Sequence, residues 1–350
     1  MCCITFNWKE NDAMEKVKHF RRKGRVSWAV IEVTEACNFN CKWCYAGSGY
    51  NRKYFKHMEK DKLKKLLEIL SESDVKQVTY SGGEPTVYPY LDYAIKEARN
   101  LDLIVHINTN GYLLTETLAR EWRKMGVTQV QINIDSKHPE KHDKIRGRKG
   151  SFDRALKAIR NARNSGITCV SQTVLTRENE KEVLDIIKIA RNAGVERVRI
   201  WDMMLSGHAR EKENLLPKEY LNTLKTVSDF ALKTGAVSIE AGEPLFPLNY
   251  ETGLKVVDSF CVCLAGLLAN FSVKGDEYFC CMYRKPLYNI FRDLNGEKFE
   301  DFHMKALKKF SYSISLPEKC KTCEFFEKCR GGCIVRRNRT SDGRDYWCSM

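Results

Sequence analysis

The sequence predicts an α/β fold: a partial (β/α)6 TIM-like barrel, with a parallel sheet covered by helices, followed by a loop-rich, cysteine-rich domain. Two observations predict this fold. Up to about residue 235, apolar β-branched segments alternate with amphipathic helical segments, which is typical of a parallel sheet. After residue 235 the alternation ends, and nine of the fifteen cysteines lie between Cys261 and Cys348.

Each expected strand is a short run rich in β-branched and apolar residues, such as VSWAVIEVT, LIVHIN and VTQVQINI. Six strands are expected, at Val26–Thr34, Val75–Tyr80, Leu103–Asn108, Val127–Ile134, Ile167–Leu175 and Val195–Met203.

The segments between the strands have the periodicity of amphipathic helices. Six helices are expected, at Lys60–Ser71, about Tyr90–Asn100, Thr115–Met125, Ser151–Asn164, Asn179–Asn192 and about Pro217–Thr234. Gly166 and Gly194 follow two of them, where glycine commonly ends a helix. The series predicts an N-terminal arm or helix over residues 1–25, a barrel over 26–235 and a second domain over 236–350.

The bulk composition is that of a soluble globular protein, with 43% hydrophobic and 30% charged residues among 350. There is no N-terminal signal pattern. The longest uncharged apolar stretch, Phe260–Val273, is shorter than the roughly 20 residues of a membrane span, so no membrane span is expected. A cytoplasmic location is therefore predicted. In that reducing compartment, fifteen cysteines favour metal ligation over disulfides.

The formal net charge of +14 has two interpretations. Most of it is expected on solvated helix faces and loops, including the basic cluster Arg52–Lys65. It also suits an anionic partner: a carboxylated small molecule, an acidic peptide, an anionic lipid or a nucleic acid. Because aromatic residues do not interleave the basic runs in a recognisable RNA-binding pattern, no DNA partner is expected and nucleic acid in general is disfavoured.

Three cysteines follow the first strand in a C-x3-C-x2-C pattern: Cys37, Cys41 and Cys44, with Tyr45 directly after them. In a β/α barrel the reactive groups occupy the loops at the C-terminal ends of the strands, so these thiols are expected at the reactive face. Three thiolates would leave one iron of a [4Fe–4S] cluster without a protein ligand.

This pattern resembles the radical S-adenosylmethionine (SAM) enzymes. The resemblance implies that SAM binds the open iron. The reduced cluster then cleaves SAM to a 5′-deoxyadenosyl radical, which abstracts a hydrogen atom from a substrate. A zinc site is the alternative, but it would need a fourth ligand close by, and the nearest histidine downstream is His57.

Further motifs at strand ends match positions that bind SAM in this family. Ser81–Pro85 (SGGEP) follows the second strand, and its adjacent glycines allow a close backbone approach to a ligand. The implied SAM contacts are Tyr45, Gly82, Gly83, Glu84, Asn110, Asn133, Asp135, Ser136, Arg146 and Gln172. For any one of these, an ordinary cap or turn role is the alternative. Trp201 and Met203 are expected in the core rather than against the adenine.

The C-terminal cysteines resemble the SPASM extension of radical SAM enzymes, which carries two auxiliary [4Fe–4S] clusters. Three clusters and SAM are therefore the implied cofactors. By resemblance, an outer set is Cys320, Cys323, Cys329 and Cys348, and an inner set is Cys263 (or Cys261), Cys280 and Cys333. Cys281 is a further candidate for the inner set, which otherwise keeps an open position. A pair of zinc ribbons is the alternative, and Cys169 is expected in the core.

The resemblance implies an oxidoreductase or maturase that works anaerobically with a low-potential electron donor of the flavodoxin or ferredoxin type. The expected substrate is a peptide or protein side chain, which would be cross-linked, oxidised or decarboxylated. A carboxylated tetrapyrrole or a lipid is the alternative, since only 36 residues precede Cys37, too few for a separate peptide-recognition domain. Sulfatase-type oxidation is disfavoured, because Cys281 stands where those members have an Asp. From another class, a non-catalytic zinc protein that binds nucleic acid stays open.

Overall fold

The computed structural model describes residues 26–49, 53–234, 238–241, 263, 266–313, 316–324, 326, 331–337, 341–346 and 348. The arm predicted over residues 1–25 lies outside the described residues, as do Cys261 and Cys329. None of the described helices is long and apolar enough to cross a membrane.

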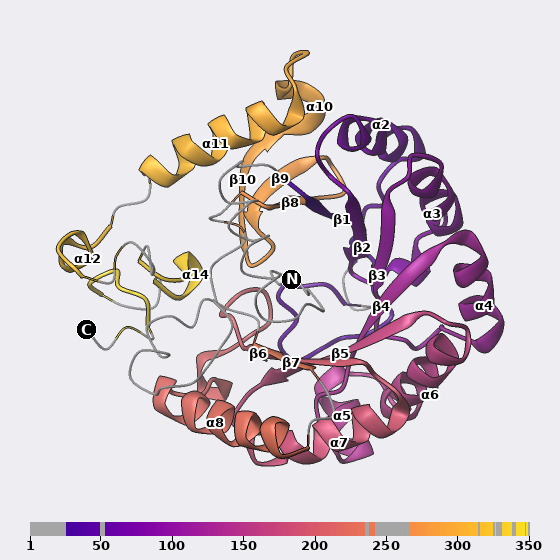
Figure 1. Cartoon of the computed structure of the whole chain (residues 1–350), viewed down its shortest axis with the longest axis vertical. Coiled ribbons are helices and arrows are strands. Elements are labelled where there is room, and N and C mark those ends of the chain that lie inside the picture. Colours follow the sequence, from indigo (N-terminus) through magenta and orange to yellow (C-terminus); the bar gives the residue numbers. More distant parts are fainter. Residues whose placement is uncertain are drawn as a thin grey trace.

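The six predicted strands are all present and pair in parallel, in sequence order, within one sheet. They are β1 (Trp28–Thr34), β2 (Gln77–Gly82), β3 (Ile104–Asn108), β4 (Val127–Asn133), β5 (Thr168–Leu175) and β6 (Arg197–Asp202). The sheet curves without closing on itself, so the fold is an open, partial barrel (Figure 1).

The six predicted helices are present as well and lie on the outer side of the curved sheet (Figure 1). They are α2 (Lys60–Ser71), α3 (Leu91–Asn100), α4 (Glu116–Met125), α6 (Ser151–Asn164), α7 (Val183–Ala193) and α8 (Pro217–Thr234). Gly194 ends α7 in the left-handed conformation, and Gly166 has φ 77° just after α6, as expected. A polar helix that the sequence pattern missed, α5 (Pro139–Arg146), lies between β4 and α6.

Alternating side chains of the strands face the helices and the interior of the barrel. On β4, Val130 and Ile132 belong to the buried apolar core. Their neighbour Gln131 instead donates from Nε2 to Oε1 of Gln172 on β5, at 2.8 Å, and accepts from Arg199 on β6. The inner face of the barrel is therefore polar at β4–β6, whereas at β1 Trp28 and Val30 belong to an apolar cluster.

Four further strands extend the sheet at both of its edges. They are β7 (Ser238–Ala241), β8 (Leu268–Phe271), β9 (Asp276–Cys280) and β10 (Tyr283–Asn289). β7 is parallel to β6, and β8 is parallel to β1, whereas β9 and β10 form an antiparallel hairpin beside β8. The order of the sheet is β10-β9-β8-β1-β2-β3-β4-β5-β6-β7. Strands from both sides of the predicted boundary at residue 235 thus share one sheet.

The remaining regular elements are short, except for one helix of the C-terminal region. The helices are α10 (Ile290–Asp293), α11 (Phe299–Ser313), α12 (Glu318–Lys321) and α14 (Ile334–Arg337). The 3-10 turns are η1 (Pro85–Val87), η2 (Glu180–Glu182) and η3 (Glu211–Glu213). In Figure 1, α12 and α14 lie across the open side of the barrel from α2–α4.

Candidate active site at the C-terminal ends of the strands

The loop that follows β1, residues 35–49 and here called the cysteine loop, carries three partly exposed thiols: Cys37, Cys41 and Cys44. Burial raises the pKa of Cys41 to about 11, although the nearby guanidinium of Arg146 opposes this shift. Burial also raises the pKa of Cys37, and the charges of Glu84, Cys41 and Cys44 raise it further. The three thiols therefore lie close to one another in a poorly solvated loop, and holding them as thiolates requires a cation or a metal centre.

Gly82 and Gly83 bring the end of β2 into direct contact with the cysteine loop. The Gly83 amide donates to the Thr34 carbonyl at 2.7 Å, and the Glu84 amide donates to the Ala36 carbonyl at 2.8 Å. A Cβ on Gly83 would lie 2.1 Å from the Ala36 oxygen. The paired glycines are thus required because two backbones meet here, whatever ligand binds alongside.

The buried carboxylate of Glu84 joins the end of β2 to the end of β3. Its Oε1 accepts from the hydroxyls of Thr109 at 2.6 Å and Thr86 at 2.7 Å, and its Oε2 accepts from the Asn110 amide at 2.7 Å. Burial raises the pKa of Glu84, while these hydrogen bonds lower it. Asn110 in turn donates from Nδ2 to Oδ1 of Asn38 at 2.7 Å, so this network reaches between the first two cysteines.

Asp135, after β4, and Arg146, at the end of α5, form an ion pair next to the cysteine loop. The Asp135 carboxylate is fully buried, accepts from the Val174 amide at 3.0 Å and pairs with Arg146 at 3.3 Å. The guanidinium carbon of Arg146 lies 5.8 Å from the ring centroid of Phe39, and the Lys42 amide donates to the Ile145 carbonyl at 2.8 Å. The arrangement places one partly buried cation beside the thiols.

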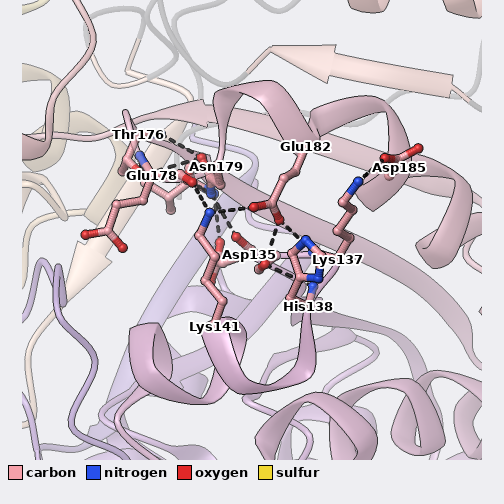
Figure 2. Close-up of polar contacts among 11 residues, drawn as sticks. Asp135, Lys137, His138, Lys141, Thr176, Glu178, Asn179, Glu182 and Asp185 are labelled. Carbon is pink, nitrogen blue, oxygen red and sulfur yellow. Dashed lines mark hydrogen bonds and ion pairs between the residues drawn. The ribbon is translucent and has the colours of Figure 1, made fainter.

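The end of β4, α5 and the start of α7 meet in a polar cluster, in which Figure 2 shows Lys137, Lys141 and Glu182. Ser136 belongs to the same cluster. Its fully buried hydroxyl donates to Oε2 of Glu182 at 2.6 Å and accepts from the His138 amide at 3.1 Å. Lys141 also pairs with Glu182, at 2.5 Å. The Ser136 hydroxyl is therefore engaged within the protein, which fits the alternative of a structural role for this residue.

The other predicted positions lie on the inner face of the barrel or in its core. Asn133 and Gln172 pair in register on β4 and β5. Trp201 and Met203 are buried, as expected, and Met203 packs in an apolar cluster with Trp43 of the cysteine loop.

Sequence patterns missed several residues that fix the cysteine loop. Lys42 lies between two of the cysteines and pairs with Glu178, and with Glu213 at 3.0 Å. The His208 amide donates to the Cys44 carbonyl at 2.9 Å, so the loop after β6 holds the far end of the cysteine loop. Lysine, glutamate and a backbone amide carry no motif, and only the fold reveals these contacts.

The C-terminal cysteines separate into two groups. Cys263, Cys280, Cys281 and Cys333 are buried within one apolar cluster. Cys320, Cys323 and Cys348 instead line a cavity of about 400 Å³ together with Arg344. Burial raises the pKa of Cys320, and Cys348 raises it further, so these thiols are neighbours. The described members of the predicted inner set thus share one apolar cluster with Cys281, and those of the predicted outer set line one cavity.

A buried ion pair organises the loop that carries Cys333. Asp345 accepts from the Cys333 amide at 2.6 Å and from Nε of Arg336 at 2.8 Å, and both charged side chains are almost fully buried. Removing one partner of such a pair would leave an uncompensated buried charge, so the pair holds this part of the chain in one arrangement.

The buried side chain of His142, next to this site, is expected to make the unfolding free energy depend on pH. Its Nδ1 accepts from the Asp135 amide at 3.1 Å, and burial lowers its pKa to about 3. In the unfolded chain the imidazole takes up a proton below about pH 6.5, whereas in the folded chain it stays neutral. The unfolding free energy therefore decreases as the pH falls below that value. Between pH 7 and pH 5, the wild type should lose about 2 kcal/mol more unfolding free energy than the His142→Asn variant. Parallel stability curves for the two proteins in denaturant titrations would contradict this account.

Comparison with known proteins agrees with this geometry. Residues 31–190 match the Radical SAM superfamily. The chain is 27% identical to the AdoMet-dependent heme synthase of Oleidesulfovibrio alaskensis, over 89% of this chain and 82% of that protein. It is also 27% identical to the mycofactocin maturase MftC of Mycolicibacterium smegmatis, over 91% of this chain and 81% of that protein.

Among solved structures, SuiB of Streptococcus suis bound to the precursor peptide SuiA has a similar fold. The TM-score is 0.77 at 16% identity, over 99% of this chain and 83% of SuiB. At this identity the likeness concerns the fold, an open α/β barrel with a C-terminal extension. The cysteine loop, the strand-end residues and the domain match agree: residues 31–190 are a radical SAM domain, and the relatives of the chain fit the SPASM-domain subfamily of these enzymes.

Proposed function

We propose that this radical SAM enzyme modifies a peptide side chain in a cavity between the barrel and the C-terminal region. The observation that carries the proposal is a cavity of about 540 Å³ that three parts of the chain share. It is lined by Leu205, Glu211, Met282, Tyr283, Arg284, Lys285 and Val335.

This cavity adjoins both the cysteine loop and the inner cysteine group. Ser206, next to Leu205, donates its hydroxyl to the Tyr45 carbonyl at 3.0 Å. The Met282 amide donates to Sγ of Cys280 at 3.4 Å. Tyr45 packs against the apolar cluster that holds the inner cysteines, and burial, together with the charges of Cys281 and Glu32, raises its pKa. A substrate in the cavity would lie between two metal-binding regions.

Cys37, Cys41 and Cys44 would hold the SAM-binding [4Fe–4S] cluster, since they share one loop and the charges of Cys41 and Cys44 act on the Cys37 thiol. When bound, this cluster supplies the reductive cleavage of SAM to a 5′-deoxyadenosyl radical that abstracts hydrogen. The chain's own contribution is positional. Glu84 and Asn110 tie the ends of β2 and β3 to the cysteine loop, and Arg146 places a positive charge beside its thiols.

Two auxiliary clusters would occupy the C-terminal cysteine groups. Cys320, Cys323, Cys348 and, by resemblance, Cys329 form the outer set. Cys263 (or Cys261), Cys280 and Cys333 form the inner set. Cys281 is buried in the same apolar group, so the inner set has a fourth thiol at hand without Cys261. We assign residues 26–235 to the radical SAM core and 236–350 to the auxiliary domain of a cytoplasmic, oxygen-sensitive enzyme.

A peptide is the preferred substrate because one relative, the PqqA peptide cyclase of Gluconobacter oxydans, acts on a peptide by name. The lining agrees, since Leu205, Met282 and Val335 offer apolar contacts and Lys285 offers a cation. A carboxylated tetrapyrrole is the second candidate. The same lysine and the similarity to the heme synthase favour it.

The test is transfer of deuterium from a labelled substrate into 5′-deoxyadenosine. The anaerobically reconstituted full chain is reduced with dithionite and given SAM, with either a deuterated precursor peptide or a deuterated iron coproporphyrin. Label from the peptide alone supports the proposal, whereas label from the porphyrin alone supports the second candidate. SAM cleavage without label from either substrate would exclude both.

A further inference from the structure

An exposed aromatic surface lies beside the start of the cysteine loop and has no part in the proposed chemistry. Tyr54 is 76% exposed, Phe55 52% and Tyr90 44%, although large aromatic side chains are usually buried. We call this surface, with the two lysines that flank Tyr54 and Phe55 in the sequence, the aromatic–basic patch: Lys53, Tyr54, Phe55, Lys56 and Tyr90.

Two of the three aromatic side chains of the patch, Phe55 and Tyr90, are in contact with neighbouring rings. Ring centroids are separated by 5.4 Å between Phe55 and His57, by 6.0 Å between His57 and Tyr88, and by 5.7 Å between Tyr88 and Tyr90. The Tyr88 hydroxyl donates to the Met58 carbonyl at 2.8 Å. A preordered surface loses less conformational entropy when a partner binds.

The patch also carries positive charge. The patch itself holds Lys53 and Lys56, and with the start of α2 residues 53–65 contain six lysines and two acidic residues, for a formal charge of +4. Of the two acidic residues, Glu59 is paired with Lys62 at 2.8 Å, and Asp61 lies in the first turn of α2. Lys53 lies over the ring of Tyr54, with its Nζ 5.5 Å from the centroid. An acidic partner therefore matches this surface electrostatically.

The patch is hydrogen-bonded to the first residues of the cysteine loop. The Glu35 amide donates to the Lys56 carbonyl at 2.8 Å, and the Lys56 amide donates to Oε2 of Glu35 at 3.0 Å. Thr34 also bonds to Nδ1 of His57 at 2.9 Å. Cys37 is two residues beyond Glu35, at most about 7 Å along the chain. A protein docked on the patch would therefore approach the thiols that hold the proposed cluster.

We propose that the aromatic–basic patch is the docking site of a small, acidic, low-potential electron-carrier protein that reduces the enzyme. The inference rests on the proposed function, which needs one electron for each SAM cleaved. A flavodoxin hydroquinone would give up that electron and become the semiquinone, and no bond would form or break at the patch. Redox partners typically meet through small interfaces, below about 1,200 Å² in total, so a patch of a few side chains is a fitting size.

The first test measures binding, with acidic flavodoxin as the probe and the fluorescence anisotropy of its flavin as the signal. Lys53→Glu/Lys56→Glu and Tyr54→Ala/Phe55→Ala should each weaken binding by about tenfold or more. The matched control, Lys124→Glu/Lys157→Glu, changes the net charge equally on exposed faces of α4 and α6 and should stay within about twofold of wild type. Equal binding by patch and control variants would overturn the inference. The inference would also be wrong if the lysine variant bound flavodoxin like the wild type but lost binding to RNA, because the patch would then be a nucleic-acid site.

The second test compares two reductants. With dithionite, the patch variants should form 5′-deoxyadenosine at the wild-type rate and retain wild-type iron content, because the patch lies outside the cofactor site. With reduced flavodoxin, their rate should fall by about tenfold or more. If dithionite yields no product even in the wild type, the proposed function fails. If dithionite works and flavodoxin drives every variant equally, only the docking inference fails.

Discussion

Replacing Cys41 with serine is expected to lower the iron content by about four per chain and to reduce SAM cleavage to the background level. Cys41 is the middle one of the three cysteines in the loop. Burial raises the pKa of its thiol, and the nearby guanidinium of Arg146 opposes that shift. Its loss leaves two thiolates, too few for the proposed cluster. Iron quantification and chromatographic assay of 5′-deoxyadenosine measure the two effects.

The matched control for this variant is Cys169→Ala. Cys169 is a free, fully buried cysteine of β5, and burial raises its pKa, as expected for a thiol in the core. Its replacement should preserve both iron content and SAM cleavage. Equal losses in the two variants would indicate a general folding defect, and normal SAM cleavage by the Cys41 variant would contradict the assignment of the cysteine loop.

Replacing Gly83 with alanine is expected to have a large effect, although Gly83 is not a metal ligand. The new Cβ would lie 2.1 Å from the Ala36 carbonyl oxygen and 2.5 Å from its carbon. Because both contacts are to backbone, they cannot be relieved by a rotamer change. We expect a loss of about 1–3 kcal/mol in unfolding free energy. We also expect SAM cleavage to fall by about 100-fold, since displaced cysteines cannot hold the cofactor in position.

Gly150→Ala is the control for this second variant. Gly150 has φ 76°, but a Cβ there would meet no atom within 4 Å, so only the conformational cost of about 1 kcal/mol applies. Its SAM cleavage should stay near wild type. Similar activity in the two variants would show that the close approach of β2 to the cysteine loop is unimportant for the chemistry.

The helices could be predicted from the sequence because their periodicity is a local property. The predicted bounds of α2, α6 and α8 agree with the structure. In contrast, α5 was missed because it is short and polar, and β8 because its four residues follow a cysteine-rich stretch without helical alternation. The pairing of β8 with β1 joins segments about 240 residues apart, which no local pattern encodes.

The candidate site was predictable where residue type and spacing carry chemistry, as in the cysteine loop. The spacing of the motifs did not reveal the hydrogen-bond partners of the polar residues at the other strand ends. Glu84 is engaged by Thr86, Thr109 and the Asn110 amide, and Ser136 by Glu182. These contacts depend on which strand ends meet in space. Polar residues such as Lys42 and Asn38, which brace the loop, carry no motif at all.

The most direct test of the central claim is electron paramagnetic resonance of the reduced, anaerobically reconstituted chain before and after SAM is added. The account predicts a [4Fe–4S]⁺ signal that changes shape when SAM binds, in the wild type and in Cys169→Ala but not in Cys41→Ser. It also predicts about twelve irons per chain. Stoichiometric zinc, or a signal that SAM leaves unchanged in the wild type, would contradict it.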